Sequence, residues 1–311
     1  MTETNSHQPV LYQEIIHALQ PVRTGLYVDC TVGAGGHAVG ILHASDPEGR
    51  LLGMDLDPQA LELAKQKLTP FRSRAILIHG SYVTLSEQLK ALEWEAVDGI
   101  LVDLGLSSMQ LDNSDRGFSF NLDGPLDMRF DPGSNLRASD LVNQLYVDDL
   151  ANIIYKYGEE RYSRKVARAI VAARPVRTTR HLAEIVAEEI SSGKRGIHPA
   201  TRTFQALRIA VNSELERLEA LLPQAVEALS PAGRLVVIAY HSLEDRIVKL
   251  FFRKESSDCI CPPRQPICTC GHLASLKVIT RKPIRPSNEE VKQNPRSRSA
   301  RMRVAERIVL T

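Results

Sequence analysis

The sequence lacks any apolar run long enough to cross a membrane. No window of the 311 residues approaches the roughly 18 consecutive apolar residues that a spanning helix needs. Hydrophobic residues make up 43% of the chain and charged residues 24%, which is ordinary for a soluble globular protein. Membrane-spanning and disordered classes are therefore excluded, and no membrane partner is expected.

The N-terminus also lacks a secretory signal. Met1 to Pro9 is polar, without the basic, apolar and small-residue series that directs export. We therefore expect a cytoplasmic protein whose five cysteines are reduced. No internal repeat is visible, and the length favours one large domain with an insertion, or two domains.

The net charge of +2 conceals an uneven distribution of charge. Ile153 to Arg208 holds 12 basic and 5 acidic residues, and Lys277 to Thr311 holds 10 and 3. Each segment has a net charge of +7, so the remainder of the chain carries −12. Solvated helix faces could account for one such segment, but two of them favour a polyanionic partner such as nucleic acid.

The first part of the chain alternates between strand and helix patterns. Short apolar, β-branched runs predict strands at Gly25 to Cys30, Leu51 to Asp55, Ala75 to His79 and Val97 to Leu104. Asp57 and Pro58 predict the start of a helix that ends at Leu68. This alternation predicts an α/β fold with a parallel, doubly wound sheet.

The alternation stops after Asp112, and a turn-rich stretch is followed by basic, helical sequence. One amphipathic helix is expected from about Leu207 to Leu229, followed by a strand from Arg234 to Tyr240. Extended runs near Val278 and Met302 could complete the sheet. We therefore expect a discontinuous sheet domain, residues 1–112 and 212–311, and an inserted helical domain, residues 113–211.

A glycine-rich loop, Asp29-Cys-Thr-Val-Gly-Ala-Gly-Gly-His37, follows the first expected strand. Gly33 and Gly35 permit a tight turn and a close ligand approach, and Asp55 ends the second strand, where a carboxylate can bind a ribose. A nucleotide-type cofactor is expected, and the alternative is a purely structural glycine turn. An NAD-linked oxidoreductase also fits the spacing, but the Asp29 carboxylate would repel a pyrophosphate and no second nucleotide-binding half is present.

Long sequence blocks along nearly the whole chain resemble the ribosomal RNA small subunit methyltransferase H (RsmH/MraW) family. The blocks are His7-Gln-Pro-Val-Leu-Tyr-Gln-Glu14, the glycine-rich loop, Asp103-Leu-Gly-Leu-Ser-Ser108, Arg116-Gly-Phe-Ser-Phe120, Gly124-Pro-Leu-Asp-Met-Arg129, Tyr157-Gly-Glu-Glu-Arg161, His198-Pro-Ala-Thr-Arg-Thr-Phe-Gln205, Val211-Asn-Ser-Glu-Leu215, His241-Ser-Leu-Glu-Asp-Arg246 and Asn294-Pro-Arg-Ser-Arg-Ser299.

The resemblance implies a Rossmann-like class I methyltransferase fold. It also implies that S-adenosylmethionine is the cofactor and that the reaction is N4-methylation of one cytidine in the decoding centre of small-subunit (16S) ribosomal RNA. The RNA would be bound within an assembled or assembling 30S subunit. The cofactor contacts that the resemblance implies are Gly35, Gly36, His37, Asp55, Tyr82, Asp103 and Gln110. Gly33 of the same loop is a further cofactor-binding candidate. At Tyr82 we expect phenylalanine in the family, and tyrosine keeps an aromatic face for the adenine.

The group that accepts the amine hydrogen bond cannot be read from the sequence. The loop after the fourth strand reads Asp103-Leu-Gly-Leu-Ser-Ser instead of the Asp/Asn-Pro-Pro-aromatic motif of many amino-methyltransferases. Ser107, Ser108 or a backbone carbonyl could accept, although a serine before a helix is commonly an N-cap. His241 is a second catalytic candidate, and its alternative role is loop orientation beside a helix cap formed by Ser242 and Asp245. The loop contains no cysteine, which fits amine rather than ring-carbon methylation.

RNA recognition is expected from the insert and the basic C-terminal segment. Candidate phosphate contacts are Arg161, Arg164, Lys165, Arg168, Arg202 and Arg208. Candidate stacking residues are Phe118, Phe120, Tyr155, Tyr157 and Phe204, with core packing as the alternative for each. An RNA-binding assembly factor without turnover is a further alternative, and the complete set of Gly35, Asp55 and Asp103 argues against it.

Two cysteine pairs, Cys259-Ile-Cys261 and Cys268-Thr-Cys270, precede His272 in a proline-rich segment. A zinc site is one alternative for these cysteines. Zinc ligands usually occur in pairs two to four residues apart, so the one-residue spacing favours an inert or redox-sensitive loop, and no metal is predicted.

Overall fold

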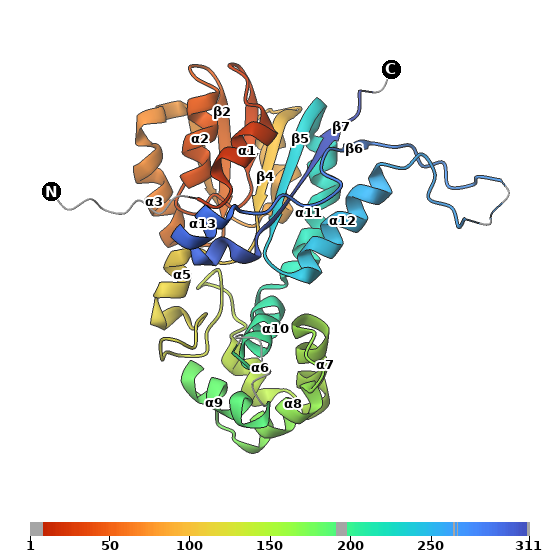
Figure 1. The fold of residues 1–311 in the computed structure, drawn as a ribbon. Helices are drawn as coiled ribbons and strands as arrows, with labels where there is room; N and C mark the ends of the chain where they lie inside the picture. Colours follow the sequence, from red (N-terminus) through yellow and green to blue (C-terminus); the bar gives the residue numbers. More distant parts are fainter. Residues whose placement is uncertain (1–8, 191–197, 264, 266, 310–311) are drawn as a thin grey trace. The chain divides into compact units, whose positions relative to one another are not determined.

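The chain divides into two compact units, each with its own hydrophobic core (Figure 1). The computed structural model describes residues 9–190, 198–263, 265 and 267–309, so His7 and Gln8 of the first resembling block lie outside it. Unit 1 comprises Met1–Gly105 and Glu216–Thr311, and unit 2 comprises Leu106–Leu215. The insert limits expected from the sequence, 113 and 211, fall inside unit 2.

Unit 1 contains one seven-stranded sheet. Its strands are β1 (Leu26–Asp29), β2 (Arg50–Asp55), β3 (Ala75–His79), β4 (Val97–Asp103), β5 (Leu229–Ala239), β6 (Leu276–Val278) and β7 (Arg301–Arg307). Its helices are α1 (Tyr12–Leu19), α2 (Gly36–Ala44), α3 (Pro58–Leu68), α4 (Leu85–Ala91), α11 (Glu214–Ala228, which begins in unit 2), α12 (Ser242–Glu255) and α13 (Asn288–Gln293), with short 3-10 turns at Thr69–Arg74, Tyr82–Thr84 and Pro295–Ser299.

The strand order is β3-β2-β1-β4-β5-β7-β6, and the first five strands in this order are parallel. Strand β7 runs antiparallel to both β5 and β6. The direction of winding changes between β1 and β4, and open α/β sheets bind ligands at the carboxyl ends of the strands beside such a switch point. The fold is Rossmann-like, as the sequence predicts.

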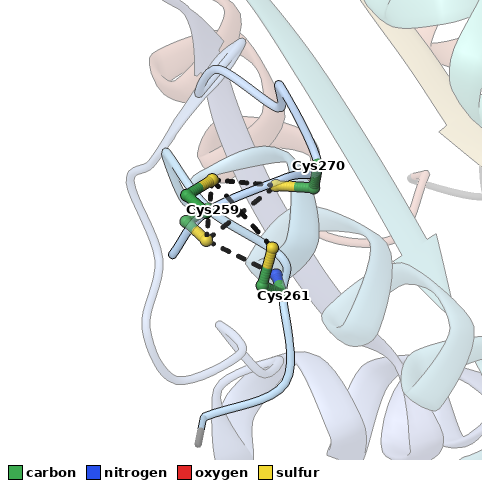
Figure 2. Close-up of side chains that lie close together, drawn as sticks. Cys259, Cys261 and Cys270 are labelled. Atoms are coloured by element: carbon green, nitrogen blue, oxygen red, sulfur yellow. Dashed lines mark hydrogen bonds between the residues drawn. The ribbon is translucent and has the colours of Figure 1, made fainter. Parts of the chain in front are cut away.

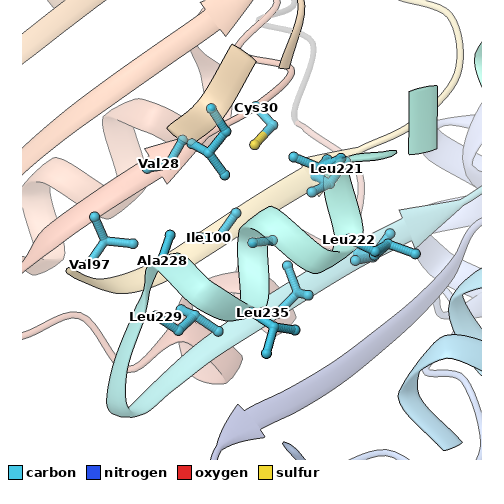
Figure 3. Packing of buried hydrophobic residues seen from close by; sticks show 14 of the residues in the cluster. Val28, Cys30, Val97, Ile100, Leu221, Leu222, Ala228, Leu229 and Leu235 are labelled. Carbon is cyan, nitrogen blue, oxygen red and sulfur yellow. The ribbon is translucent and has the colours of Figure 1, made fainter. Parts of the chain in front are cut away.

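Helices cover both faces of this sheet because the buried strands present apolar side chains alternately to each side. Ile100 faces a core formed with α4, α11 and α12, and Leu101 faces a second core formed with α1, α2 and α3. Figure 3 shows residues of the first core between α11 and the central strands, among them Val28, Leu222 and Leu235. A rigid sheet of this kind positions the loops at its carboxyl edge.

The described residues of unit 2 form helices and no strand. The helices are α5 (Ser108–Asp112), α6 (Ala138–Gln144), α7 (Val147–Gly158), α8 (Ser163–Ala172), α9 (Thr179–Glu189) and α10 (Thr201–Asn212), with a 3-10 turn at Ser114–Arg116. Helices α7 and α8 bury Leu150, Ile154, Val166 and Ile170 against a common core and leave their polar faces exposed.

The prediction of one continuous helix from Leu207 to Leu229 is wrong, because α10 ends at Asn212 and α11 begins at Glu214. Ser213 between them has a left-handed φ of 48°. The Asn212 side chain donates to the carbonyls of Met128 and Arg208 and accepts from the N–H of Phe130. The contacts with Met128 and Phe130, more than 80 residues away in the chain, stabilise the break, and the apolar periodicity gives no sign of them.

Strand β5 begins earlier than predicted. Its pairing with β4 jumps from Val97–Leu229 to Gly99–Arg234, and Ala232 between them has a φ of 64°. Ser230-Pro-Ala-Gly, between the predicted helix and the predicted strand, is therefore an irregular segment within the strand.

Candidate functional site

Three aspartates end neighbouring strands at the carboxyl edge of the sheet. Asp29 ends β1, Asp55 ends β2 and Asp103 ends β4. Because β1 and β4 are the strands on either side of the switch point, their loops form the ligand-binding edge of such a sheet. The candidate site is therefore acidic.

The glycine-rich loop connects β1 to α2 through two left-handed residues. Gly33 has a φ of 52° and Gly35 a φ of 79°, a conformation that favours glycine. The Gly33 N–H donates to Asp55 Oδ2 at 2.8 Å, and the Gly35 N–H donates to the Val32 carbonyl at 2.8 Å.

These two N–H groups already have partners within the protein, so they stabilise the loop and are not the donors that a ligand would use. The donors that a ligand could use lie at the start of α2, where Gly36 and His37 occupy the first turn and the helix supplies no partner for their N–H groups.

Asp29 is buried and incompletely hydrogen-bonded. Its side chain is 1% exposed, and Oδ1 accepts from the Thr31 N–H at 3.2 Å. Oδ2 has no hydrogen-bond partner among the described residues. Burial raises the pKa of Asp29 to about 7, although nearby His37 and the Thr31 N–H act in the opposite direction. A buried carboxylate oxygen without a donor indicates a place for a cationic or donating ligand group.

An acceptor atom of His37 faces an acceptor atom of Asp103. The His37 Nε2 atom lies 3.0 Å from the Val10 carbonyl, which can only accept, so Nε2 carries the proton. Burial lowers the pKa of His37, which favours the neutral ring and leaves a lone pair on Nδ1. Nδ1 lies 3.7 Å from Asp103 Oδ2. A protonated Asp103 or a ligand donor would satisfy both atoms.

Asp103 is held by residues that the sequence analysis did not identify. The Tyr240 hydroxyl donates to Asp103 Oδ1 at 3.0 Å, and the Asp103 N–H donates to Thr31 Oγ1 at 2.7 Å. Burial raises the pKa of Asp103 to about 7, with the Tyr240 hydrogen bond opposing the shift and Glu244 adding to it. Tyr240 directly follows β5, and its position beyond a strand end was the available signal.

Asp55 keeps both oxygens in contact with the backbone. Oδ2 accepts from Gly33, and Oδ1 accepts from the Asp57 N–H at 2.9 Å. Burial raises the pKa of Asp55. Each oxygen retains a further lone pair that could accept from a hydroxyl. Tyr82 begins the 3-10 turn after β3 and packs partly buried against the core of unit 1, next along this edge.

Gln110 and the two serines belong to unit 2. The Ser107 Oγ atom accepts from the Gln110 N–H at 3.2 Å, and Gln110 Oε1 accepts from the Ser107 N–H at 3.1 Å. This reciprocal pair is a capping box at the start of α5. Ser107 is therefore the helix cap, Ser108 is the first helical residue, and the Gln110 side chain is 6% exposed.

His241 is the N-cap of α12. Its Nδ1 atom accepts from the Glu244 N–H at 3.4 Å, and Glu244 Oε2 accepts from the His241 N–H at 3.2 Å. The expected cap of Ser242 and Asp245 is wrong, because Asp245 instead accepts from Arg303 at 2.6 Å. The His241 cap and the contact of Arg303 in β7 with Asp245 together position the start of α12, directly after β5.

The basic residues expected to meet RNA differ in their availability. Arg161, Arg164, Lys165 and Arg168 are exposed around α8, although Lys165 Nζ lies 3.0 Å from Glu189. Arg202 is exposed and lies 3.4 Å from Glu160. The prediction for Arg208 is not supported by its environment, because its guanidinium is 12% exposed and binds both oxygens of Glu214 at 2.8 Å.

Most of the candidate stacking residues pack inside unit 2. Phe118 is 6% exposed and stacks on Phe130, and Phe204 is 5% exposed and contacts Phe120 edge to face. Tyr157 is half-buried beside Lys156. Tyr155 is 64% exposed. Two further tyrosines, Tyr146 and Tyr162, are exposed and were not predicted, and they are the N-cap residues of α7 and α8 respectively.

None of the described helices has the length and apolar character needed to cross a membrane. Residues 4–308 match the model of the MraW methylase family. The chain is 53% identical to a ribosomal RNA small subunit methyltransferase H of Dehalococcoides mccartyi, over 97% of this chain and 87% of that one. It is 51% identical to the protein of the same name from Thermomicrobium roseum, over 98% and 94%.

Among solved structures, an rRNA methylase from Streptococcus thermophilus aligns at 10% identity and a TM-score of 0.42, over 96% of this chain and 94% of that one. The sequence matches decide the assignment, and they extend over nearly the full length. This chain belongs to the MraW methylase family, whose methyl donor is S-adenosylmethionine.

Proposed function

We propose that this protein transfers a methyl group from S-adenosylmethionine to small-subunit ribosomal RNA, at the N4 amino group of one cytidine in the decoding centre. The names of relatives that are more than 50% identical over nearly the whole chain support the RNA substrate. The N4 position and the decoding centre come from the family resemblance. We expect the reaction to take place in the cytoplasm, on an assembled or assembling 30S subunit.

The observation that most favours this cofactor is buried Asp29 Oδ2, which has no hydrogen-bond partner in the part of the chain that the structure describes. S-adenosylmethionine carries a sulfonium and an α-ammonium group, and its cationic groups suit an edge that buries Asp29 and Asp103. A pyrophosphate would meet the same carboxylates with repulsion, so the geometry also argues against the oxidoreductase alternative.

Each cofactor residue then has a proposed task. The neighbouring acceptors of Asp29, His37 and Asp103 hold the amino-acid part, and the first-turn N–H groups at Gly36 and His37 lie at the helix start where a carboxylate is favoured. Asp55 accepts the ribose hydroxyls and Tyr82 lies against the adenine. The bound cofactor supplies an activated methyl group.

Gly33 and Gly35 shape the loop. Gln110 is proposed as a cofactor contact from unit 2, where its capping box fixes the start of α5.

Alignment is the main contribution that the protein makes to the reaction. The amine of cytosine is a poor nucleophile because its lone pair is delocalised into the ring. Holding donor and acceptor in line can contribute roughly 7–11 kcal/mol, whereas a positioned proton acceptor adds about 10²- to 10⁴-fold. Binding geometry therefore dominates.

Ser108 and His241, the two catalytic candidates, have different proposed roles. Ser108 is the first residue of α5, and Ser107 provides the cap. For His241 we favour positioning, since Nδ1 accepts from the backbone and Nε2 lies 3.1 Å from Glu244 Oε1. Such a residue orients the loop that also carries Tyr240, the partner of Asp103.

Unit 2 is proposed to recognise RNA. Exposed Arg161, Arg164 and Arg168 can contact phosphates, and exposed Tyr146, Tyr155 and Tyr162 can stack on unpaired bases. Phosphate contacts position the RNA, and stacked bases add affinity with little sequence preference.

The deciding experiment incubates the protein with methyl-labelled S-adenosylmethionine and RNA from cells that lack this enzyme. Assembled small subunits and naked ribosomal RNA are tested side by side, and the label is mapped by nuclease digestion and mass spectrometry. Label on cytidine N4 supports the proposal, and comparison of the two substrates shows which form is used. Cofactor binding without label on either substrate would favour an assembly factor without turnover.

A further inference from the structure

Four thiols converge in the exposed loop between α12 and β6. Cys259, Cys261, Cys268 and Cys270 place their sulfur atoms within 4.8 Å of one another. Figure 2 shows the sulfurs of Cys259, Cys261 and Cys270 pointing toward one another although these residues come from two separate stretches of the loop. The sulfur–sulfur distances are 3.5 Å for Cys259–Cys268, 3.6 Å for Cys268–Cys270, 3.9 Å for Cys259–Cys270 and 4.0 Å for Cys261–Cys268.

These four separations are close to those of a tetrahedron of thiolates around one ion. Zinc–sulfur bonds measure about 2.3 Å, which places the corners of a tetrahedral site about 3.8 Å apart. A disulfide would bring two sulfurs to about 2.05 Å, and all four cysteines are free. The spacing leaves room for one ion and not for a cluster of several irons between the thiolates.

Backbone N–H groups also point at the sulfurs. Ile260 donates to Cys270, Cys261 donates to Cys259, and Thr269 donates to Cys261, each at 3.4 Å. Such hydrogen bonds stabilise negative charge on a thiolate, which is the form that binds metal. The one-residue spacing, which argued against a metal in the sequence, thus results in a compact knuckle.

The described residues of the loop form no apolar core that could hold this shape. Ile260, Ile267 and Leu273 are 44%, 74% and 71% exposed. No helix or strand forms among its described residues, and in Figure 1 it extends away from the sheet. A small exposed loop of this kind commonly depends on a cross-link or a metal for a defined structure.

His272 is held elsewhere. Its Nδ1 atom lies 2.8 Å from the Ser257 carbonyl, and its Nε2 atom lies 3.6 Å from Glu255. The Ser275 N–H donates to the Glu255 carbonyl at 2.8 Å. These contacts close the base of the loop and leave the four thiols as the complete ligand set.

We infer that Cys259, Cys261, Cys268 and Cys270 bind one structural Zn²⁺ ion that holds the loop between α12 and β6 in shape. Tetrahedral sites of four sulfurs select zinc or iron, and zinc forms closed structural sites with such ligand sets. On binding, each thiol forms a bond to zinc and loses its proton to solvent, with no change of oxidation state. The site is separate from the carboxyl edge of the sheet.

The test is metal analysis of the full-length protein, purified under reducing conditions without chelators. We expect one zinc per chain by plasma mass spectrometry. Cys259→Ser and Cys268→Ser, one from each cysteine pair, should each lose the ion. Two matched variants in the same segment, Ile267→Ser and His272→Ala, should keep it. Retained binding of S-adenosylmethionine shows that the cysteine variants are folded.

A second measurement reports on geometry. Replacement of zinc by Co²⁺ should give the intense visible bands of a tetrahedral thiolate site, and Cys259→Ser should abolish them. A protein that takes up neither zinc nor cobalt would overturn the inference. Stoichiometric iron, or a disulfide between these cysteines in the freshly purified protein, would overturn it as well. Loss of zinc from His272→Ala would overturn the four-cysteine ligand set.

Discussion

The two units of this protein present charge in opposite ways. At the carboxyl edge of unit 1, a few acidic side chains are buried, and burial raises the pKa values of Asp29 and Asp103 to about 7. On unit 2, Arg164 and Arg168 stand exposed on α8 above a separate apolar core. A small cationic cofactor can be bound through a few desolvated contacts, whereas a polyanion is bound through many exposed contacts.

The sharpest test of this comparison removes one buried charge. Asp29→Asn keeps the shape of the side chain and should weaken S-adenosylmethionine binding by about 2–5 kcal/mol, roughly thirtyfold or more. Calorimetric titration measures the loss. Asp46→Asn, at a side chain that is 67% exposed, serves as the control and should bind normally. Unchanged affinity in Asp29→Asn would show that Oδ2 does not meet the cofactor.

The reciprocal test inverts exposed charge on unit 2. The double variant Arg164→Glu, Arg168→Glu should weaken RNA binding by roughly tenfold or more and reduce its salt dependence, because two phosphate contacts are lost. S-adenosylmethionine binding should not change. The matched control is Lys65→Glu, Lys67→Glu on exposed positions of α3 in unit 1. Equal losses in both double variants would indicate a general charge effect rather than a surface on unit 2.

Substitutions of exposed and of buried aromatic residues in unit 2 should have different effects. Tyr155→Ala removes a side chain that is 64% exposed and should cost about 1–3 kcal/mol of RNA affinity with little change in stability. Phe204→Ala, in the core, should cost about 3–5 kcal/mol of stability. RNA titration and thermal unfolding measure the two effects. The assignment fails if Tyr155→Ala binds RNA as well as the parent protein.

The smallest expected effect is pH dependence. Asp29 and Asp103 ionise in the folded protein near pH 7, and a cationic ligand favours the ionised forms, so cofactor affinity should rise from pH 6 to pH 8 with release of protons. In the unfolded chain an aspartate ionises near pH 3.9. The folded state therefore binds more protons between about pH 4 and pH 7, and the contribution of these groups to stability should fall as pH rises through that range. Cofactor affinity that falls from pH 6 to pH 8 would contradict the assignment.

Several residues show which structural features a local sequence pattern can predict. The helix Pro58–Leu68 and the strand Ala75–His79 have the predicted bounds, because an N-cap with proline and a bounded apolar run are local signals. Arg208 shows the limit. Its basic character indicated a surface contact, and its pairing with Glu214 depends on the break after α10. That break depends in turn on Asn212 and a segment more than 80 residues away.

The sequence by itself determined the α/β class, the glycine loop, the strand-end aspartates and the family, since each rests on local periodicity or on an ordered set of motifs. Tertiary structure decided what no spacing encodes: the missing partner of Asp29 Oδ2, the hydroxyl of Tyr240 at Asp103, and the convergence of four thiols from two parts of one loop. The reason is physical. Burial, desolvation and metal-ligand geometry depend on the distances between residues in the folded chain, and these distances are set by packing.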